Sequence, residues 1–159
     1  MNLSDVTEII SGLNEAGVTV WVDGGWCVDA LVERELREHN DLDIAINRQD
    51  EKALQDWLAK QGYTDRTSPD RSEWNYVVGD DNGCLIDIHV FEFDCEGNHI
   101  YGTAYPRESL TGHAILGGIE INCISPDWMF RFKTGYTPLP KDIIDIHALA
   151  EKYGYKILL

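Results

Sequence analysis

The stretch VWVDGGWCVDALVERELREHNDLDIAI, from Val20 to Ile46, decides the fold that this sequence predicts. An apolar run over 18–22 favours a buried strand through its β-branched and aromatic residues. Gly24 and Gly25 end that run and allow the backbone to turn sharply and to approach a ligand closely. A short helix is expected next, and a second strand over 41–46 closes the unit.

The second predicted strand carries an alternation of acidic and apolar residues. Side chains two positions apart share a face of a strand, so Leu42, Ile44 and Ile46 face a core. Asp41 and Asp43 then face the other way together. Two ionised carboxylates repel each other unless a positive charge lies between them. Mg²⁺ binds through a few carboxylates together with substrate phosphates, so the pattern predicts that Asp41 and Asp43 are metal ligands.

A phosphate site is predicted beside these carboxylates. Gly24 and Gly25 stand at the start of the short helix, where backbone N–H groups bind phosphate. Metal ligands and a phosphate cradle in one short unit imply a nucleotide.

A third carboxylate is predicted on the strand over 85–93. Its alternation leaves Asp87 and His89 on the face opposite the apolar residues. Asp87 would complete a metal site, and it could take a proton from a metal-bound hydroxyl. For His89, a hydrogen-bonded side chain is expected rather than a metal ligand.

These motifs together resemble the signature of the polymerase-β-like nucleotidyltransferase superfamily. The resemblance is carried by the Gly24-Gly25-Trp26 turn, by Asp29 and by the run REHNDLD over 37–43. The strings WVDGGW over 21–26 and LIDIH over 85–89 resemble the small antibiotic nucleotidyltransferases, the lincosamide enzymes first and the aminoglycoside 2''-type enzymes next. The resemblance extends to Gly135-Tyr136 and to KDIIDI over 141–146. The superfamily's usual Gly-Ser is Gly-Gly here, as in the antibiotic-modifying branch, which removes a hydroxyl contact to phosphate.

The resemblance implies an α+β chain with the polymerase-β-like nucleotidyltransferase fold, a mixed twisted sheet with helices packed mainly on one face. Strands that come singly or in pairs, without regular βαβ alternation, favour the same class. One domain is expected over 1–159. Its nucleotide and metal core would occupy about 1–93, and an acceptor-side loop and C-terminal helices would occupy about 94–159.

The resemblance also implies roles for individual residues. Asp41, Asp43 and Asp87 would be catalytic and would hold two Mg²⁺ ions, with ATP as the nucleotide. The candidate nucleotide contacts are Gly24, Gly25, Arg37, His39 and Lys141. Arginine forks well onto phosphate oxygens, but a basic residue beside two acids can also simply balance their charge. Lys141 is a candidate by analogy with related enzymes, and the alternative is an ordinary solvated lysine.

Composition limits the partners. The net charge is −15, from 13 basic and 28 acidic residues, which disfavours nucleic acid because binding to phosphates needs a basic face. The same acidity would attract metal ions and cationic small molecules, although it is equally consistent with solubility alone. No apolar run is long enough to span a bilayer, and the N-terminus lacks signal-peptide features. A cytoplasmic location is therefore expected.

Four functions are compatible with the predicted nucleotide and metal site. The favoured one is transfer of AMP from ATP to a hydroxyl of a small, amine-bearing antibiotic, a lincosamide first, with release of pyrophosphate. The alternatives are an aminoglycoside nucleotidyltransferase, a protein-modifying enzyme of the antitoxin kind, and a nucleotide-binding module without catalysis. The last is disfavoured because such a module gains little from three uncompensated carboxylates. A homodimer is expected, since so short a chain supplies only one wall of an acceptor pocket.

The remaining elements follow from periodicity and turn residues. Helices are predicted over 4–16, 50–60 and 140–153, with another that starts at Ser125 and ends at Gly135. Strands are predicted over 74–78, 85–93 and 119–124, and a loop over 64–72. The stretch 94–118 shows no clear period, and it is a candidate for shaping the acceptor pocket.

Overall fold

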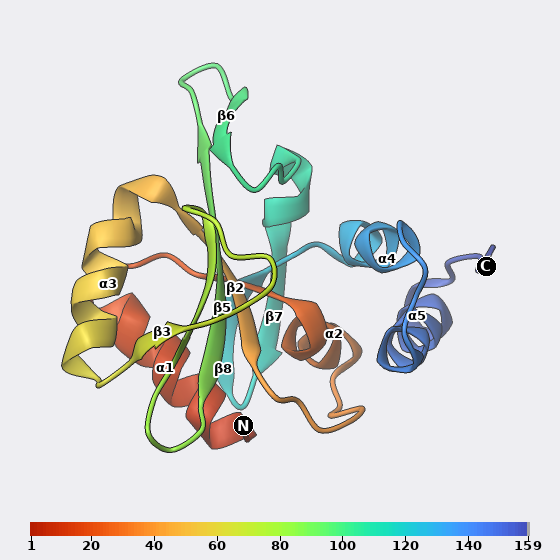
Figure 1. Ribbon diagram of the computed structural model, residues 1–159. Helices are drawn as coiled ribbons and strands as arrows, with labels where there is room; N and C mark the ends of the chain where they lie inside the picture. The colour runs from red at the N-terminus through yellow and green to blue at the C-terminus, as the bar shows by residue number, and fades with distance from the viewer. Residues whose placement is uncertain (159) are drawn as a thin grey trace.

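The structure is a computed structural model of the protein, and it describes residues 1–158. In this part of the chain, eight strands form a mixed sheet in the order β3-β4-β5-β2-β1-β8-β7, with β6 paired to β5 (Figure 1). The strands are β1 (Trp21–Asp23), β2 (Leu42–Asn47), β3 (Thr64–Arg66), β4 (Asn75–Gly79), β5 (Leu85–Phe93), β6 (His99–Gly102), β7 (Gly112–Leu116) and β8 (Ile119–Cys123). The pairs β2–β5 and β1–β8 are parallel, and the other pairs are antiparallel.

Helices lie on both sides of this sheet. They are α1 (Leu3–Glu15), α2 (Gly24–Val32), α3 (Glu51–Lys60), α4 (Pro126–Thr134) and α5 (Pro140–Tyr153). Figure 1 shows α1 and α3 on one side and α2, α4 and α5 on the other. The arrangement is the predicted α+β class with a mixed sheet, and its helices are divided more evenly between the two sides than the sequence led us to expect. None of the helices over 1–158 combines the length and apolar character needed to cross a membrane.

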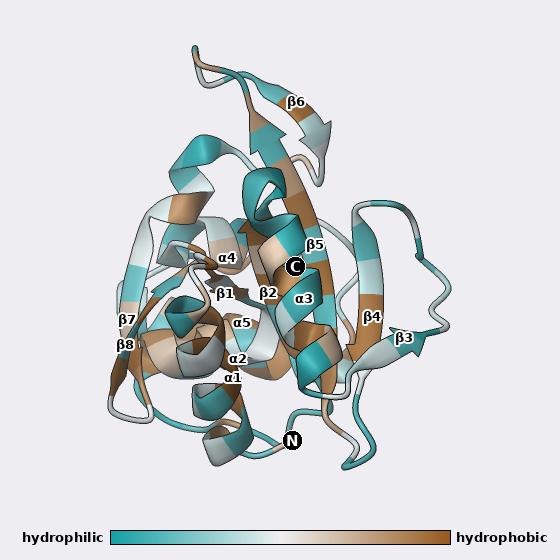
Figure 2. Cartoon of the chain, turned by 90° about the vertical axis from the view of Figure 1, so that its left-hand side faces the viewer, coloured by the Kyte–Doolittle hydropathy of each residue, from teal (hydrophilic) through white to brown (hydrophobic). Residues whose placement is uncertain are grey.

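The hydrophobic core fills both sides of the sheet: one part lies between the sheet and the helices α1 and α3, and another part surrounds the buried helix α2 (Figure 1). Alternate residues of β2 and β5 are fully buried, namely Leu42, Ile44, Ile46, Ile86, Ile88 and Val90. Figure 2 views the molecule from the α3 side, and the brown, hydrophobic strands β2 and β5 lie behind this helix. Full burial of each such side chain contributes about 1.5–3 kcal/mol, so this face fixes how the two strands pair.

The opposite face of the same strands carries a row of carboxylates. Asp23 on β1 pairs in register with Asp43 on β2, and Asp43 pairs in register with Asp87 on β5. Neighbouring strands are about 4.8 Å apart, so three acidic side chains stand next to one another across the sheet.

Most predicted elements are present, and three differ. The stretch 64–72, predicted as a loop, contains the short strand β3, which pairs with β4. The unassigned stretch 94–118 forms β6, a 3₁₀ helix (Arg107–Thr111) and β7. Asp41 precedes β2 instead of lying within it, because the ladder to β5 begins with the pairing of Leu42 and Ile86.

Candidate active site

A cavity of about 520 Å³ opens on the carboxylate side of the sheet. From the part of the chain that ends with β5 it is lined by Asp23, Gly24, Gly25, Asp41, Asp43 and His89. From the part after β5 it is lined by Tyr105, Met129, Phe132, Leu139 and Lys141. One wall is therefore acidic and close to the start of α2. The other wall, formed by α4, α5 and the segment after β6, combines these aromatic and aliphatic side chains with the charged Lys133, Lys141 and Asp142.

Burial and mutual repulsion raise the pKa of several carboxylates on this side of the sheet. Burial, followed by the nearby charges of other aspartates, raises the pKa of Asp87 to about 6. Burial and the charge of Asp43 also raise the pKa of Asp23. The pKa of Asp41 is raised for the same two reasons, although Lys141 at the start of α5 opposes the shift. Each shift means that a positive charge placed among these groups would be stabilised.

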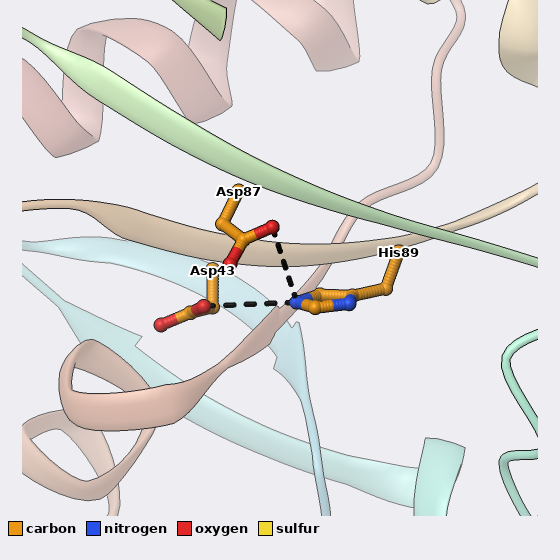
Figure 3. A group of neighbouring side chains, drawn as sticks. All are labelled: Asp43, Asp87 and His89. Carbon is orange, nitrogen blue, oxygen red and sulfur yellow. Dashed lines mark ion pairs between the residues drawn. The ribbon is translucent and has the colours of Figure 1, made fainter. Parts of the chain in front are cut away.

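A divalent cation fits among three of these side chains. Ligand atoms of Asp43, Asp87 and His89 all lie within 4.8 Å of one another. Figure 3 shows the His89 ring directed at both carboxylates, with Nε2 at 3.6 Å from Asp43 Oδ1 and 3.7 Å from Asp87 Oδ1. Asp87 Oδ1 is buried, and within 1–158 it has no hydrogen-bond partner. An unpaired buried oxygen beside a second carboxylate is the donor set that a hard cation requires.

The other predicted metal ligand, Asp41, lines the same cavity but is outside this close cluster. His89 is influenced by all the surrounding acids. Burial lowers the pKa of His89, but Asp43, Asp87 and Asp23 raise it by a larger amount, so that the pKa is about 9.

The two glycines bring the backbone against the acidic wall. Gly24 has a φ of +61°, and a Cβ there would overlap the Asp43 carboxylate. A Cβ at Gly25 would overlap the His39 ring. The Gly24 N–H donates to Asp23 Oδ1 at 2.7 Å, whereas the next amides belong to the first turn of α2, where helical N–H groups have no partner in their own helix. A side chain at either glycine would therefore occupy the space between the start of α2 and the acidic wall.

Arg37 and His39, the predicted triphosphate contacts, both line the cavity. Each of them is already paired with a carboxylate of the protein. His39 is buried, and its Nε2 lies 2.5 Å from Asp29 Oδ2. Arg37 donates from Nε and Nη2 to the two oxygens of Asp145, at 3.2 and 2.9 Å. Lys141 lines the cavity and is exposed.

Asp145 joins this wall to the C-terminal helices. Its side chain is fully buried, and besides Arg37 it contacts Lys133 Nζ of α4 at 2.9 Å. Lys133 also donates to Asp142 at 3.0 Å. Two cations and two carboxylates thus form a buried network between α4, α5 and the segment before β2.

Two residues of the cavity were missed in the sequence. Tyr105 donates its hydroxyl hydrogen to Asp23 Oδ2 at 2.7 Å, which ties the segment after β6 to the acidic row. Pairing of β1 with β2 would have placed Asp23 opposite Asp43, so Asp23 was accessible to sequence reasoning. Tyr105 was not, because it lies in the aperiodic stretch 94–118.

Acidic side chains on adjacent strands, beside a helix that starts at Gly-Gly, define a nucleotidyltransferase. The model of the aminoglycoside-2''-adenylyltransferase family matches residues 5–149. The chain belongs to this family. The predicted resemblance to antibiotic nucleotidyltransferases is confirmed.

Similar proteins carry the names of two classes of antibiotic. A lincosamide resistance protein of Staphylococcus haemolyticus is 29% identical over 161 residues, covering 94% of this chain and 98% of that protein. A 2''-aminoglycoside nucleotidyltransferase of Klebsiella pneumoniae is 33% identical over 49 residues, covering 29% of this chain and 28% of that protein.

Two solved structures share the fold. The lincomycin-bound lincosamide antibiotic adenylyltransferase LnuA has a TM-score of 0.80 and 24% identity, covering 94% of this chain and 96% of its own. ANT(2")-Ia in complex with adenylyl-2"-tobramycin has a TM-score of 0.78 and 18% identity, covering 94% of this chain and 88% of its own. The predicted fold class is confirmed by these likenesses.

The Asp145 network gives a prediction about stability. Asp145→Asn should lower the free energy of unfolding by about 3 kcal/mol or more, because Arg37 would lose its carboxylate partner and the buried Lys133 would keep only Asp142. Denaturant unfolding followed by circular dichroism measures the change. The matched control is Glu92→Gln, which breaks the exposed pair with Arg48 and should cost less than about 1 kcal/mol. Equal effects of the two variants would show that the network adds nothing.

Proposed function

We propose that this nucleotidyltransferase transfers AMP from ATP to a hydroxyl of a lincosamide antibiotic and releases pyrophosphate. The observation that carries the proposal is the carboxylate row of Asp23, Asp43 and Asp87 beside the Gly24-Gly25 helix start. Asp23 and Asp43 of this row line the cavity, and Asp87 stands next to Asp43 on β5. The choice of acceptor is supported by the lincosamide resistance relative, which matches over nearly the whole of both chains, whereas the aminoglycoside relative matches over 29% of this one.

Asp41, Asp43 and Asp87 are assigned as the residues that hold divalent cations, and we propose two Mg²⁺ ions. When bound, such ions neutralise phosphate charge and lower the pKa of the acceptor hydroxyl. Asp87 is also assigned as the general base. It stands in register with Asp43 on the adjacent strand, where a carboxylate can take the proton of a metal-bound hydroxyl.

In the proposed reaction the acceptor oxygen forms a bond to the α-phosphorus of ATP. The bond between that phosphorus and the bridging oxygen breaks, pyrophosphate leaves with the bonding electrons, and the hydroxyl proton passes to Asp87. The first-turn amides of α2 beyond Gly24, together with Lys141, are assigned as the groups that bind the phosphates. Arg37 and His39 are assigned a supporting role, because their pairing with Asp145 and Asp29 holds them against Gly25.

The two unlike walls of the cavity suit an acceptor that is partly apolar and carries an amine. Tyr105, Met129, Phe132 and Leu139 offer aromatic and aliphatic surface, and the acidic row attracts a cation. A lincosamide combines an amine with a hydroxylated sugar and apolar substituents. An aminoglycoside, which is polar throughout, would leave these four side chains without an apolar partner.

We also propose a homodimer. Leu139, Ile143 and Ile144 at the start of α5 are 56%, 41% and 46% exposed, close to the cavity. A second copy would cover this apolar surface and extend the acceptor wall. Sedimentation velocity at micromolar concentration should give the mass of two chains, and a fully active monomer would contradict the proposal.

The metal assignment predicts the effect of one substitution. Asp43→Asn should reduce turnover at least about a hundredfold, because the ions and the charge they neutralise are lost from the transition state. Its melting temperature should stay within a few degrees of wild type, since the variant also removes repulsion within the acidic row. Asp56→Asn, on the exposed side of α3, is the control and should remain fully active. An active Asp43→Asn enzyme would remove this site from the mechanism.

The acceptor is tested by mass spectrometry. Enzyme and Mg²⁺ are incubated with each nucleoside triphosphate and with lincomycin, clindamycin, kanamycin or tobramycin, and Asp43→Asn serves as the blank. The expected product is lincomycin or clindamycin carrying one AMP, with one pyrophosphate released for each. Modification of kanamycin or tobramycin alone would reassign the acceptor to the aminoglycosides. Labelling of protein side chains, with both antibiotic classes untouched, would overturn the proposed function.

A further inference from the structure

His89 lies in the cluster with Asp43 and Asp87, but it has not been assigned a role in metal binding above. It lies two residues after Asp87 on β5, so both side chains leave the same face of the sheet. Its side chain is 19% exposed and lines the cavity. The ring is directed along the sheet toward Asp43 and Asp87, as Figure 3 shows.

The distances favour a shared cation over direct hydrogen bonds. His89 Nε2 is 3.6 Å from Asp43 Oδ1 and 3.7 Å from Asp87 Oδ1, which is longer than an N–H···O hydrogen bond of about 2.7–3.2 Å. Two ligand atoms that are each about 2.1 Å from one metal ion are separated by roughly 3.0–3.6 Å at bond angles between 90° and 120°. A small movement of the side chains would bring all three atoms onto one ion.

The neighbouring strand leaves room for this ring orientation. The residue in register with His89 on β2 is Ala45, which is fully buried and shares a face with Asp43. Its single methyl group allows the imidazole to lean toward the carboxylates. Asp87 Oδ1 faces the ring and, among the described residues, has no hydrogen-bond partner, so its lone pairs are available to a metal.

We propose that His89 Nε2 is a ligand of a divalent cation held by Asp43 and Asp87, and that it shifts the preference of this site from Mg²⁺ toward Mn²⁺ or Co²⁺. The proposal rests on the metal site assigned under the proposed function. Mg²⁺ takes oxygen ligands almost exclusively, whereas imidazole nitrogen suits first-row transition metals. A site of two carboxylates and one imidazole therefore binds these metals more tightly than an all-oxygen site does.

The test uses Co²⁺ alone, without nucleotide or antibiotic. Wild type and His89→Gln are titrated with Co²⁺ by visible absorption and with Mg²⁺ by calorimetry, and their melting temperatures are compared first. If His89→Gln does not fold, His89→Asn replaces it. His113→Gln, which changes an exposed histidine on β7, is the matched control.

The expected result is Co²⁺ binding at least about tenfold weaker in His89→Gln, a loss of the size seen when histidine coordination is disturbed. Binding of Mg²⁺ should change by less than about threefold, because Mg²⁺ gains little from a nitrogen ligand. Wild type and His113→Gln should show a hyperfine-shifted imidazole proton in the NMR spectrum of the Co²⁺ form, and His89→Gln should lack it.

Two outcomes would overturn the assignment of His89. Unchanged Co²⁺ affinity would show that the ring is not a ligand. Stronger binding of both metals in His89→Gln would show that protonated His89 only neutralises the carboxylates. Asp43→Asn in the same titration separates this failure from that of the metal site itself, because the site fails only if Asp43→Asn binds Co²⁺ as wild type does.

Discussion

The pairing of β2 with β5 is the constraint on which the rest of the structure depends. It places Asp43 beside Asp87, an arrangement that electrostatics alone opposes. The opposite face of the same two strands stabilises it, because Ile44 and Ile88 are completely buried there. A shift of one residue would exchange the two faces, exposing the apolar side chains and burying the acids. The hydrophobic core thus holds together charges that would otherwise separate.

Ion pairs connect the elements that form the other side of the cavity. Arg37, from the segment before β2, and Lys133, from α4, both contact the fully buried carboxylate of Asp145 on α5. The helices that form this side are therefore attached to the segment that leads into the acidic strand. One wall carries unbalanced negative charge for a ligand to neutralise, whereas behind the other wall Arg37 and Lys133 are balanced by Asp142 and Asp145.

Sequence reasoning could predict the parts of the site that depend on short-range pattern. The alternation around Asp43 and Asp87 gave their faces, and Gly24 with Gly25 gave the turn before α2. It could not predict contacts between distant segments, such as the bond of Tyr105 to Asp23 across 82 positions or of Arg37 to Asp145 across 108. The three residues of β3 were too few to show a period. The closeness of the His89 ring to Asp43 also depends on the pairing of β5 with another strand, which alternation within β5 does not encode.

The parallel pairing of β1 with β8, in which Trp21 lies opposite Asn122, has a consequence for how the chain folds. While the protein is being synthesised, the row of Asp23, Asp43 and Asp87 leaves the ribosome before β8, the strand that covers the free side of β1. Until then β1 is an open edge, and open edges attract other strands. Closing so long a loop is slow compared with forming local contacts. Until β8 has been synthesised, the packing of α1 and α3 against the sheet (Figure 1) is therefore what keeps the nascent chain compact.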